Sequence, residues 1–263
     1  MPEFTRHLPG TFSWPELATT DQKSAVAFYC ALFGWSADDQ PIGPDDMYTL
    51  FKLRGLEVGA GYTMREDERA MGMPPHWNSY ITVENVDESA KKAAALGGTV
   101  LAQPFDVMDA GRMAVLRDPA GAVFQIWQGN RSIGAKILGE PNTLVWTELT
   151  TNDPSAAETF YTALLGWTAK HATESPMQYT EFTVQGAAGP SVGMMPKPPH
   201  LPPHVPSFWL PYFMVADVDA CVGTAKSLGA QVHVEPQDIP GTGRFAVVVD
   251  PQGAAFSVFT PKA

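Results

Sequence analysis

The feature that most constrains the fold of this chain is an internal repeat at one fixed offset of 132 residues. The run Trp-x-Glu-Leu at residues 14–17 returns at residues 146–149, and the run Asp-Pro-x-Gly at residues 118–121 returns at residues 250–253. Aromatic, glycine and arginine positions between them return at the same offset. Chance does not hold one offset across a whole domain, so we interpret the chain as a tandem duplication.

The repeat sets the domain boundaries. A chain of 263 residues is long for one compact core and suits two. We place domain 1 at residues 1–131 and domain 2 at residues 132–263, with a linker around residues 129–141.

Each domain divides again into two units with the element order βαβββ. In the first unit a helix is predicted by apolar residues at i, i+3, i+4 and i+7 spacing, which are Ala25, Phe28, Tyr29 and Leu32. Asp21 is placed to cap the start of this helix and Gly34 to end it. The pattern restarts at Asn78, and we expect Asp87 to cap the second helix. The chain therefore has the pattern of an α+β protein with four βαβββ modules.

Composition limits the partners. The chain has 17 basic and 28 acidic residues, a formal charge of −11, which repels phosphate backbones and anionic lipid. No stretch reaches the roughly 20 apolar residues of a membrane span, and no signal-like apolar run opens the sequence. Cys30 and Cys221 are too few for a disulfide framework or a structural zinc site. We expect a cytoplasmic protein that binds neither nucleic acid nor membrane.

Two local motifs carry a resemblance to a known family. Phe-Tyr-x-x-Leu-x-Gly-Trp at residues 28–35 and Asp-Pro-x-Gly before the last strand both occur in each domain. With the doubled βαβββ unit they resemble the vicinal oxygen chelate fold of the glyoxalase, bleomycin-resistance and extradiol-dioxygenase superfamily. The resemblance implies that each pair of modules forms a cup-shaped mixed sheet with helices on the outside. In detail the sequence is similar to tandem two-domain actinobacterial proteins described as glyoxalase-like or as hydroxylases.

The resemblance also implies where a metal would bind. Metal-dependent members place ligands on the first and last strands of each module. Here those positions hold Trp14, Asn78, Gln125 and a residue near Gly61 in domain 1, and Trp146, Leu210, Ser257 and a residue near Gly193 in domain 2. Indole, leucine and serine do not hold a divalent ion, and amide oxygens hold it weakly beside imidazole and carboxylate. We expect no metal and no other cofactor.

Side-chain alternation along the strands predicts which residues face the cups. In domain 1 they are Trp14, Glu16, Asn78, Tyr80, Gln125 and Trp127, and in domain 2 they are Trp146, Glu148, Leu210, Tyr212, Ser257 and Phe259. Each cup then has aromatic walls, one carboxylate and a few neutral polar groups, which suits a flat organic ligand. The alternative is that the tryptophans serve packing and that the carboxylates have structural partners.

Arg112 and Arg244 follow a glycine in both repeats and are further candidate ligand-binding residues. In one interpretation they pair with Glu16 and Glu148 at the cups. In the other they form ion pairs with Asp106 and Asp238 that brace the Gly-Arg loop.

Two classes of function remain open at this level. The protein binds a small, aromatic organic molecule, such as a natural product, without chemistry. Alternatively it is a metal-independent hydroxylase-like or cyclisation accessory enzyme with Glu16 or Glu148 as general base, since burial raises the pKa of a carboxyl. A metal-dependent lyase or dioxygenase is disfavoured by the residues at the ligand positions. A monomer and a homodimer both fit.

Overall fold

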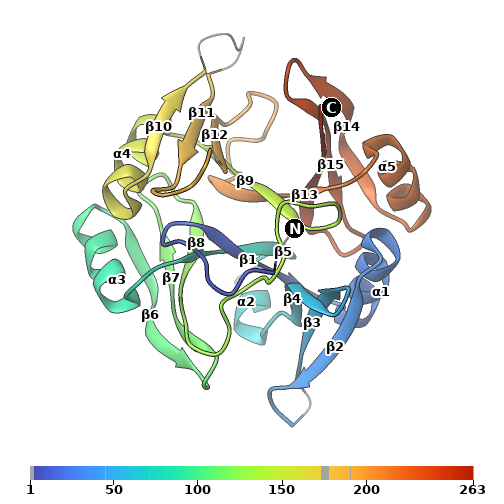
Figure 1. The fold of residues 1–263 in the computed structure, drawn as a ribbon, viewed down its shortest axis with the longest axis horizontal. Coiled ribbons are helices and arrows are strands. Elements are labelled where there is room, and N and C mark those ends of the chain that lie inside the picture. The colour runs from blue at the N-terminus through green and yellow to red at the C-terminus, as the bar shows by residue number, and fades with distance from the viewer. Residues whose placement is uncertain (1–2, 45, 71, 173–177, 190, 263) are drawn as a thin grey trace.

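The protein is described by a computed structural model over residues 3–44, 46–70, 72–172, 178–189 and 191–262, and each half forms one eight-stranded mixed sheet (Figure 1). Sheet 1 has the order β2 (Ser36–Pro41), β3 (Met47–Leu53), β4 (Leu56–Thr63), β1 (Phe12–Thr19), β5 (His76–Thr82), β8 (Val123–Gly129), β7 (Gly111–Arg117), β6 (Thr99–Val107). Sheet 2 has the order β10 (Thr168–His171), β11 (Thr180–Thr183), β12 (Val192–Pro196), β9 (Leu144–Thr151), β13 (Phe208–Met214), β16 (Ala255–Pro261), β15 (Gly243–Val249), β14 (Gln231–Ile239). The predicted α+β class and the pairing of modules are confirmed.

In each sheet the two modules meet where their first strands pair antiparallel. In sheet 1 this junction joins β1 to β5, with Glu16 opposite Asn78 and Trp14 opposite Tyr80. In sheet 2 it joins β9 to β13, with Glu148 opposite Leu210. The first strands of both modules therefore lie at the centre of the sheet, where they bring the predicted cup residues side by side.

The described helices are α1 (Gln22–Phe33), α2 (Glu66–Ala70), α3 (Val86–Ala95), α4 (Pro154–Leu165) and α5 (Val218–Ser227). As predicted, the Asp21 carboxylate accepts from the Ser24 N–H at the start of α1, and Gly34 ends the helix at a φ of 67°. The expected cap of α3 was wrong. Asn85 caps that helix, because Asp87 lies inside its first turn, where it binds Arg112 instead. Among the described residues, no helix is both long and apolar enough to cross a membrane.

The two sheets share one hydrophobic core, and the long helices lie at its flanks (Figure 1). Phe28 and Tyr29 of α1 contact Phe256 of β16, and Phe124 of β8 contacts Phe160 and Tyr161 of α4. Each of these helices thus packs against the sheet of the other domain. The face of each sheet outside its cup is the interface between the domains.

Reciprocal hydrogen bonds cross this interface. Tyr29 Oη donates to Asp250 Oδ2 at 3.0 Å, and Tyr161 Oη donates to Asp118 Oδ2 at 3.0 Å. Both aspartates belong to the Asp-Pro-x-Gly turns, and both tyrosines are fully buried. The turn of each domain therefore holds a helix of the other.

The predicted linker packs onto sheet 1. The Ala135 N–H donates to the Ser13 carbonyl at 2.7 Å, and the Lys136 N–H donates to the Glu57 carbonyl at 2.8 Å. Ala135 is fully buried in a small cluster with Trp14 and Trp127. This segment contributes to the wall of the first cup, and the division between residues 131 and 132 stays a prediction.

Candidate functional site

The face of sheet 1 turned away from the shared core brings together the residues predicted to face the first cup. Trp14, Tyr80 and Trp127 pack there in one apolar cluster with Ala60 and Met113. We call this face cup 1. The matching face of sheet 2, which carries Trp146, Glu148, Leu210, Tyr212, Ser257 and Phe259, is cup 2.

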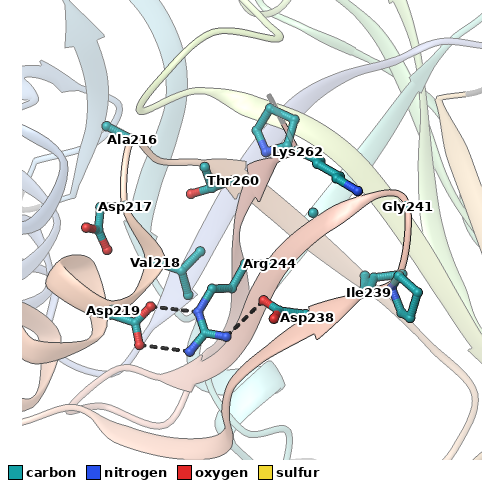
Figure 2. A pocket seen from close by; sticks show the side chains of 13 residues that line it. Ala216, Asp217, Val218, Asp219, Asp238, Ile239, Gly241, Arg244, Thr260 and Lys262 are labelled. Carbon is teal, nitrogen blue, oxygen red and sulfur yellow. Dashed lines mark hydrogen bonds and ion pairs between the residues drawn. The ribbon is translucent and has the colours of Figure 1, made fainter.

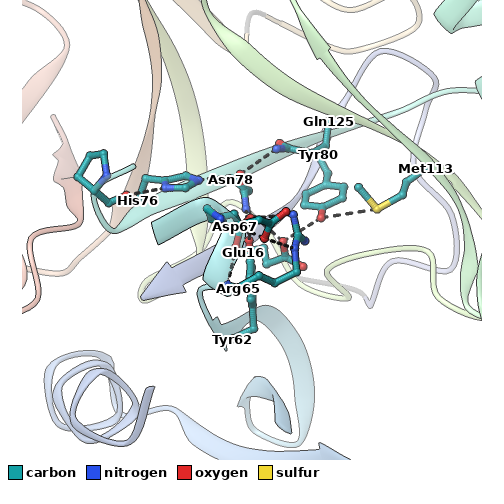
Figure 3. A network of polar contacts seen from close by, with 11 residues as sticks. Glu16, Tyr62, Arg65, Asp67, His76, Asn78, Tyr80, Met113 and Gln125 are labelled. Carbon is teal, nitrogen blue, oxygen red and sulfur yellow. Dashed lines mark hydrogen bonds and ion pairs between the residues drawn. The ribbon is translucent and has the colours of Figure 1, made fainter. Parts of the chain in front are cut away.

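Glu16 is the carboxylate of cup 1, and it is 7% exposed (Figure 3). Tyr48 Oη donates to its Oε1 at 2.7 Å, Tyr80 Oη donates to Oε2 at 2.8 Å, and Asn78 Nδ2 donates to Oε2 at 3.2 Å. All three donors are neutral, and in the described part of the chain no lysine or arginine pairs with this carboxylate. Burial raises the pKa of Glu16, and the hydrogen bonds and nearby His76 offset only part of that rise.

An amide pair extends the Glu16 network across the sheet. Gln125 Nε2 donates to Asn78 Oδ1 at 2.8 Å, and His76 Nε2 lies 3.2 Å from the same oxygen. Because Asn78 gives an N–H to Glu16, its oxygen is the atom that faces Gln125. This leaves Gln125 Oε1 buried, without a hydrogen-bond partner among the described residues. An unpaired buried carbonyl costs about 1–3 kcal/mol.

Tyr62 continues the network towards the surface. Its Oη lies 3.5 Å from Asn78 Nδ2 and donates to Glu68 Oε1 at 3.1 Å. Glu68 belongs to α2 and pairs with the exposed Arg65 at 3.3 Å. A continuous chain of polar contacts thus joins Glu16 to α2 (Figure 3).

Cup 2 repeats the carboxylate and its tyrosines without the amides. Glu148 is 8% exposed and accepts from Tyr179 Oη and Tyr212 Oη, each at 2.8 Å, and burial raises its pKa. Leu210 stands where cup 1 has Asn78. Ser257 stands where cup 1 has Gln125, and its hydroxyl donates to the Ala246 carbonyl at 2.8 Å. Cup 2 is therefore the less polar site.

Tyr48 and Tyr179 are functional candidates that the sequence reasoning missed. Trp14 Nε1 donates to Tyr48 Oη at 3.0 Å, and Trp146 Nε1 donates to Tyr179 Oη at 3.2 Å, so each tyrosine links an indole to a carboxylate. The repeat offset carries Tyr48 onto Thr180 rather than onto Tyr179. A search that allowed a shift of one residue from the repeat offset could have matched Tyr48 with Tyr179.

The fourth expected ligand position differs between the cups. Ala60, not Gly61, lies opposite Glu16, while a Cβ at Gly61 would point at Phe51 in the core. In cup 2 Gly193 lies opposite Glu148 as expected. A Cβ there would lie 2.0 Å from Tyr179 Oη, so only glycine fits beneath that ring.

These donor sets do not fit a divalent metal. The indoles of Trp14 and Trp146 donate to tyrosines, Asn78 Oδ1 already accepts from Gln125, and Leu210 offers no donor atom. In the ranges that the structure describes, no three His, Cys, Asp or Glu side chains gather to hold an ion.

Arg112 and Arg244 lie away from the cup carboxylates. Arg112 binds Asp87 at 2.7 Å and Asp106 at 2.8 Å. Arg244 repeats this arrangement with Asp219 at 2.6 Å and Asp238 at 2.9 Å (Figure 2). The structure thus shows the bracing ion pair and does not bring either arginine to a cup glutamate. The Arg244 pair borders an open pocket of about 550 Å³, and the carboxylates among its described lining residues, Asp217, Asp219 and Asp238, are all exposed.

Comparison with family models settles the fold family. The model of the Glyoxalase/Bleomycin resistance protein/Dioxygenase superfamily matches residues 11–126 and 143–258. The chain belongs to this superfamily. The two matches correspond to the two sheets and leave the segment that packs on sheet 1 between them.

Relatives within the superfamily match almost the whole chain. CFP32 of Mycobacterium tuberculosis, provisionally named a glyoxylase, is 44% identical over 262 residues, which are 99% of this chain and 98% of the relative. The anthracycline biosynthesis protein DnrV of Streptomyces peucetius is 34% identical over 279 residues, covering 97% of this chain and 94% of DnrV.

Solved structures of other superfamily members share the fold. The Mn(II)-bound glyoxalase of Novosphingobium aromaticivorans aligns with a TM-score of 0.66 and 18% identity, over 96% of this chain and 83% of that one. The 2,3-dioxygenase LapB of a Pseudomonas species aligns with a TM-score of 0.66 and 13% identity, over 100% of this chain and 94% of that one. At these identities the likeness concerns the fold alone.

Proposed function

We propose that this superfamily member binds a small aromatic organic molecule in its cups, without a metal. The observation that carries the proposal is the buried Glu16 carboxylate, held by three neutral donors inside a wall of indole and phenol rings. Aromatic rings stack on such walls, and a few polar groups orient the bound molecule. The name of DnrV places that relative in anthracycline biosynthesis, which supports a natural product as the ligand.

A second function is favoured by the raised pKa of Glu16 and Glu148. A carboxyl whose pKa lies above its usual range is a stronger base once it is ionised. In this alternative the protein is a metal-independent hydroxylase-like or cyclisation accessory enzyme, and one of these glutamates removes a proton from the bound molecule. The neighbouring tyrosine hydroxyls would hold the carboxylate in position.

Tryptophan fluorescence tests the binding proposal. Quinones, anthracyclines and simple phenols should quench the emission saturably, because Trp14 and Trp146 lie in the cup walls. Trp14→Ala removes a stacking contact of about 0.5–1.5 kcal/mol beyond the buried area, and should weaken binding about tenfold if cup 1 is used. Trp146→Ala is the matched control for cup 2.

Glu16→Gln separates binding from catalysis, because it keeps the shape and removes the base. Under the binding proposal affinity stays within a few-fold and no product forms. Under the enzyme alternative turnover falls by about 10²–10⁴-fold while binding persists. Absence of saturable quenching by every compound would overturn both, and a stoichiometric metal found by elemental analysis would contradict the metal-free part.

A further inference from the structure

Cup 1 contains a buried hydrogen-bond acceptor for which the described residues supply no donor. Gln125 is 4% exposed, and its Oε1 has no hydrogen-bond partner among the described residues. The amide cannot simply turn over. Asn78 donates its N–H to Glu16, so its oxygen must receive the Gln125 N–H. The network that stabilises Glu16 therefore also fixes the free oxygen of Gln125 as an acceptor.

A second acceptor lies beside the first. A carboxylate accepts about four hydrogen bonds, and Glu16 receives three. Asn78 hydrogen-bonds to both Gln125 and Glu16, and Tyr80, which stands opposite Gln125 across β5 and β8, also donates to Glu16. A ligand group that meets them must donate hydrogen bonds and must not be an anion, since Glu16 would repel it.

An apolar row leads from this point to the edge of sheet 1. Trp127 on β8 stands opposite Met113 on β7, and Met113 stands opposite Phe105 on the edge strand β6. Phe105 is 44% exposed, whereas Trp127 and Met113 are buried. The row is therefore accessible to solvent at its outer end and covered at its inner end.

Among the residues that the structure describes, cup 2 has neither feature. Ser257 replaces Gln125, and its hydroxyl already donates to a carbonyl. The equivalent row runs from Phe259 through Phe245 to Gln237, so its outer end is an exposed amide rather than a phenyl ring. The carboxylate and its tyrosines therefore occur in both cups, whereas the unpaired acceptor, Gln125 Oε1, and the exposed phenyl ring of Phe105 have no equivalent at the matching positions among the described residues of domain 2.

From these differences we infer that cup 1, and not cup 2, is the ligand site, and that its ligand is an aromatic molecule with a neutral hydroxyl or amino donor at one end. The donor binds Gln125 Oε1 beside Glu16, and the apolar body lies along Trp127, Met113 and Phe105. This inference rests on the proposed function and adds the class of ligand and the domain that binds it.

Equilibrium dialysis with matched probes tests the inference without any variant. The probes are 2-naphthol and 2-hydroxyanthraquinone, the methyl ether of each, and 2-naphthoic acid as the anion. We expect one phenol per chain, about five- to tenfold tighter binding of each phenol than of its ether, and the weakest binding for the acid. Equal binding of phenols and ethers, or two equivalent sites per chain, overturns the inference.

Two substitutions locate the site. Gln125→Met keeps the side-chain length and should abolish the preference for phenols over ethers. Phe105→Gln, which copies the residue of domain 2, should weaken phenols and ethers alike by about three- to tenfold. Ser257→Ala is the matched control in cup 2 and should leave both affinities unchanged. Circular dichroism and thermal melts establish that each variant is folded.

The failures are distinguishable. If Tyr212→Phe or Trp146→Ala weakens binding while Gln125→Met does not, a small-molecule site exists but lies in cup 2, and only this inference falls. If no probe binds the wild-type protein, the inference and the proposed function fall together.

Discussion

At the scale of single residues, two carboxylates, Glu16 and Glu148, lie in aromatic surroundings, and their hydrogen-bond donors in the described part of the chain are all neutral. Burial raises the pKa of both above that of an exposed glutamate. A group whose pKa is raised by folding stabilises the protein below its unfolded-state pKa. That contribution is lost as the pH rises through the folded-state pKa.

The change in the free energy of unfolding caused by Glu16→Gln should therefore be more favourable at pH 7 than at pH 4. Glutamine keeps the shape of the side chain but does not ionise. The wild-type protein loses stability when Glu16 ionises as the pH rises, and the variant does not. Urea unfolding of both proteins at the two pH values measures the difference. Asp118 and Asp250, whose pKa values burial also raises, are present in both proteins and cancel. A difference that is the same at both pH values would contradict the assignment.

The cup residues show how far sequence reasoning reaches at this scale. Strand alternation placed Trp14, Glu16 and Tyr80 on one face, because neighbouring strands impose that geometry. Tyr48 was missed, because its counterpart Tyr179 lies one residue away from the repeat offset in the sequence. The ion pair of Arg112 with Asp106 was one of the two predicted interpretations, and the structure shows it. Its second partner, Asp87, comes from a helix end that the sequence could not place beside it.

At the scale of elements, α1 and α4 are equivalent helices with different last turns. In α4 the buried residue of that turn is Leu164, which lies at the repeat offset from Leu32. In α1 it is Phe33, and Leu32 is only half-buried, so the prediction for Leu32 was wrong. Phe33 contacts Phe213 of the other domain. Which of two adjacent residues at a helix end is buried depends on the residues of the other domain that pack against it. The periodicity of one domain's sequence does not contain that information.

Leu164→Ala and Leu32→Ala should differ in their cost to stability. Leu164 is buried in the shared core, so its truncation should lower the free energy of unfolding by about 2–5 kcal/mol. Leu32 is partly exposed, so the same change should cost less than half as much. Denaturant unfolding of the two variants compares equivalent positions of one chain. Equal losses would mean that the buried faces of the two helices are alike after all.

At the scale of the whole molecule, the repeat predicted two domains but not that they share one core. Hydrophobic patterns show which face of a helix is apolar, and they do not show whose sheet covers it. The cup shape of the sheets was predicted from the resemblance to the superfamily and not from the hydrophobic pattern. The exchange of Tyr29 and Tyr161 between domains came only from the structure.

The shared core predicts that neither domain is stable alone. A chain divided into residues 1–140 and 141–263 keeps the segment that packs on sheet 1 with its own domain. Each fragment leaves a helix and a sheet face uncovered, so alone it should show no cooperative unfolding transition.

The two fragments should form a one-to-one complex when they are mixed at equal concentration. This complex should unfold in a single transition, and sedimentation and circular dichroism can detect it. Tyr29→Phe removes the hydrogen bond to Asp250 Oδ2 across the interface and leaves the indole N–H of Trp77 without its acceptor. It should weaken reassembly by about 1–3 kcal/mol, or roughly 5- to 150-fold in Kd. The control, Tyr62→Phe, lies in cup 1 and should leave reassembly unchanged. Cooperative unfolding of either fragment alone would show that each half has a sufficient core of its own.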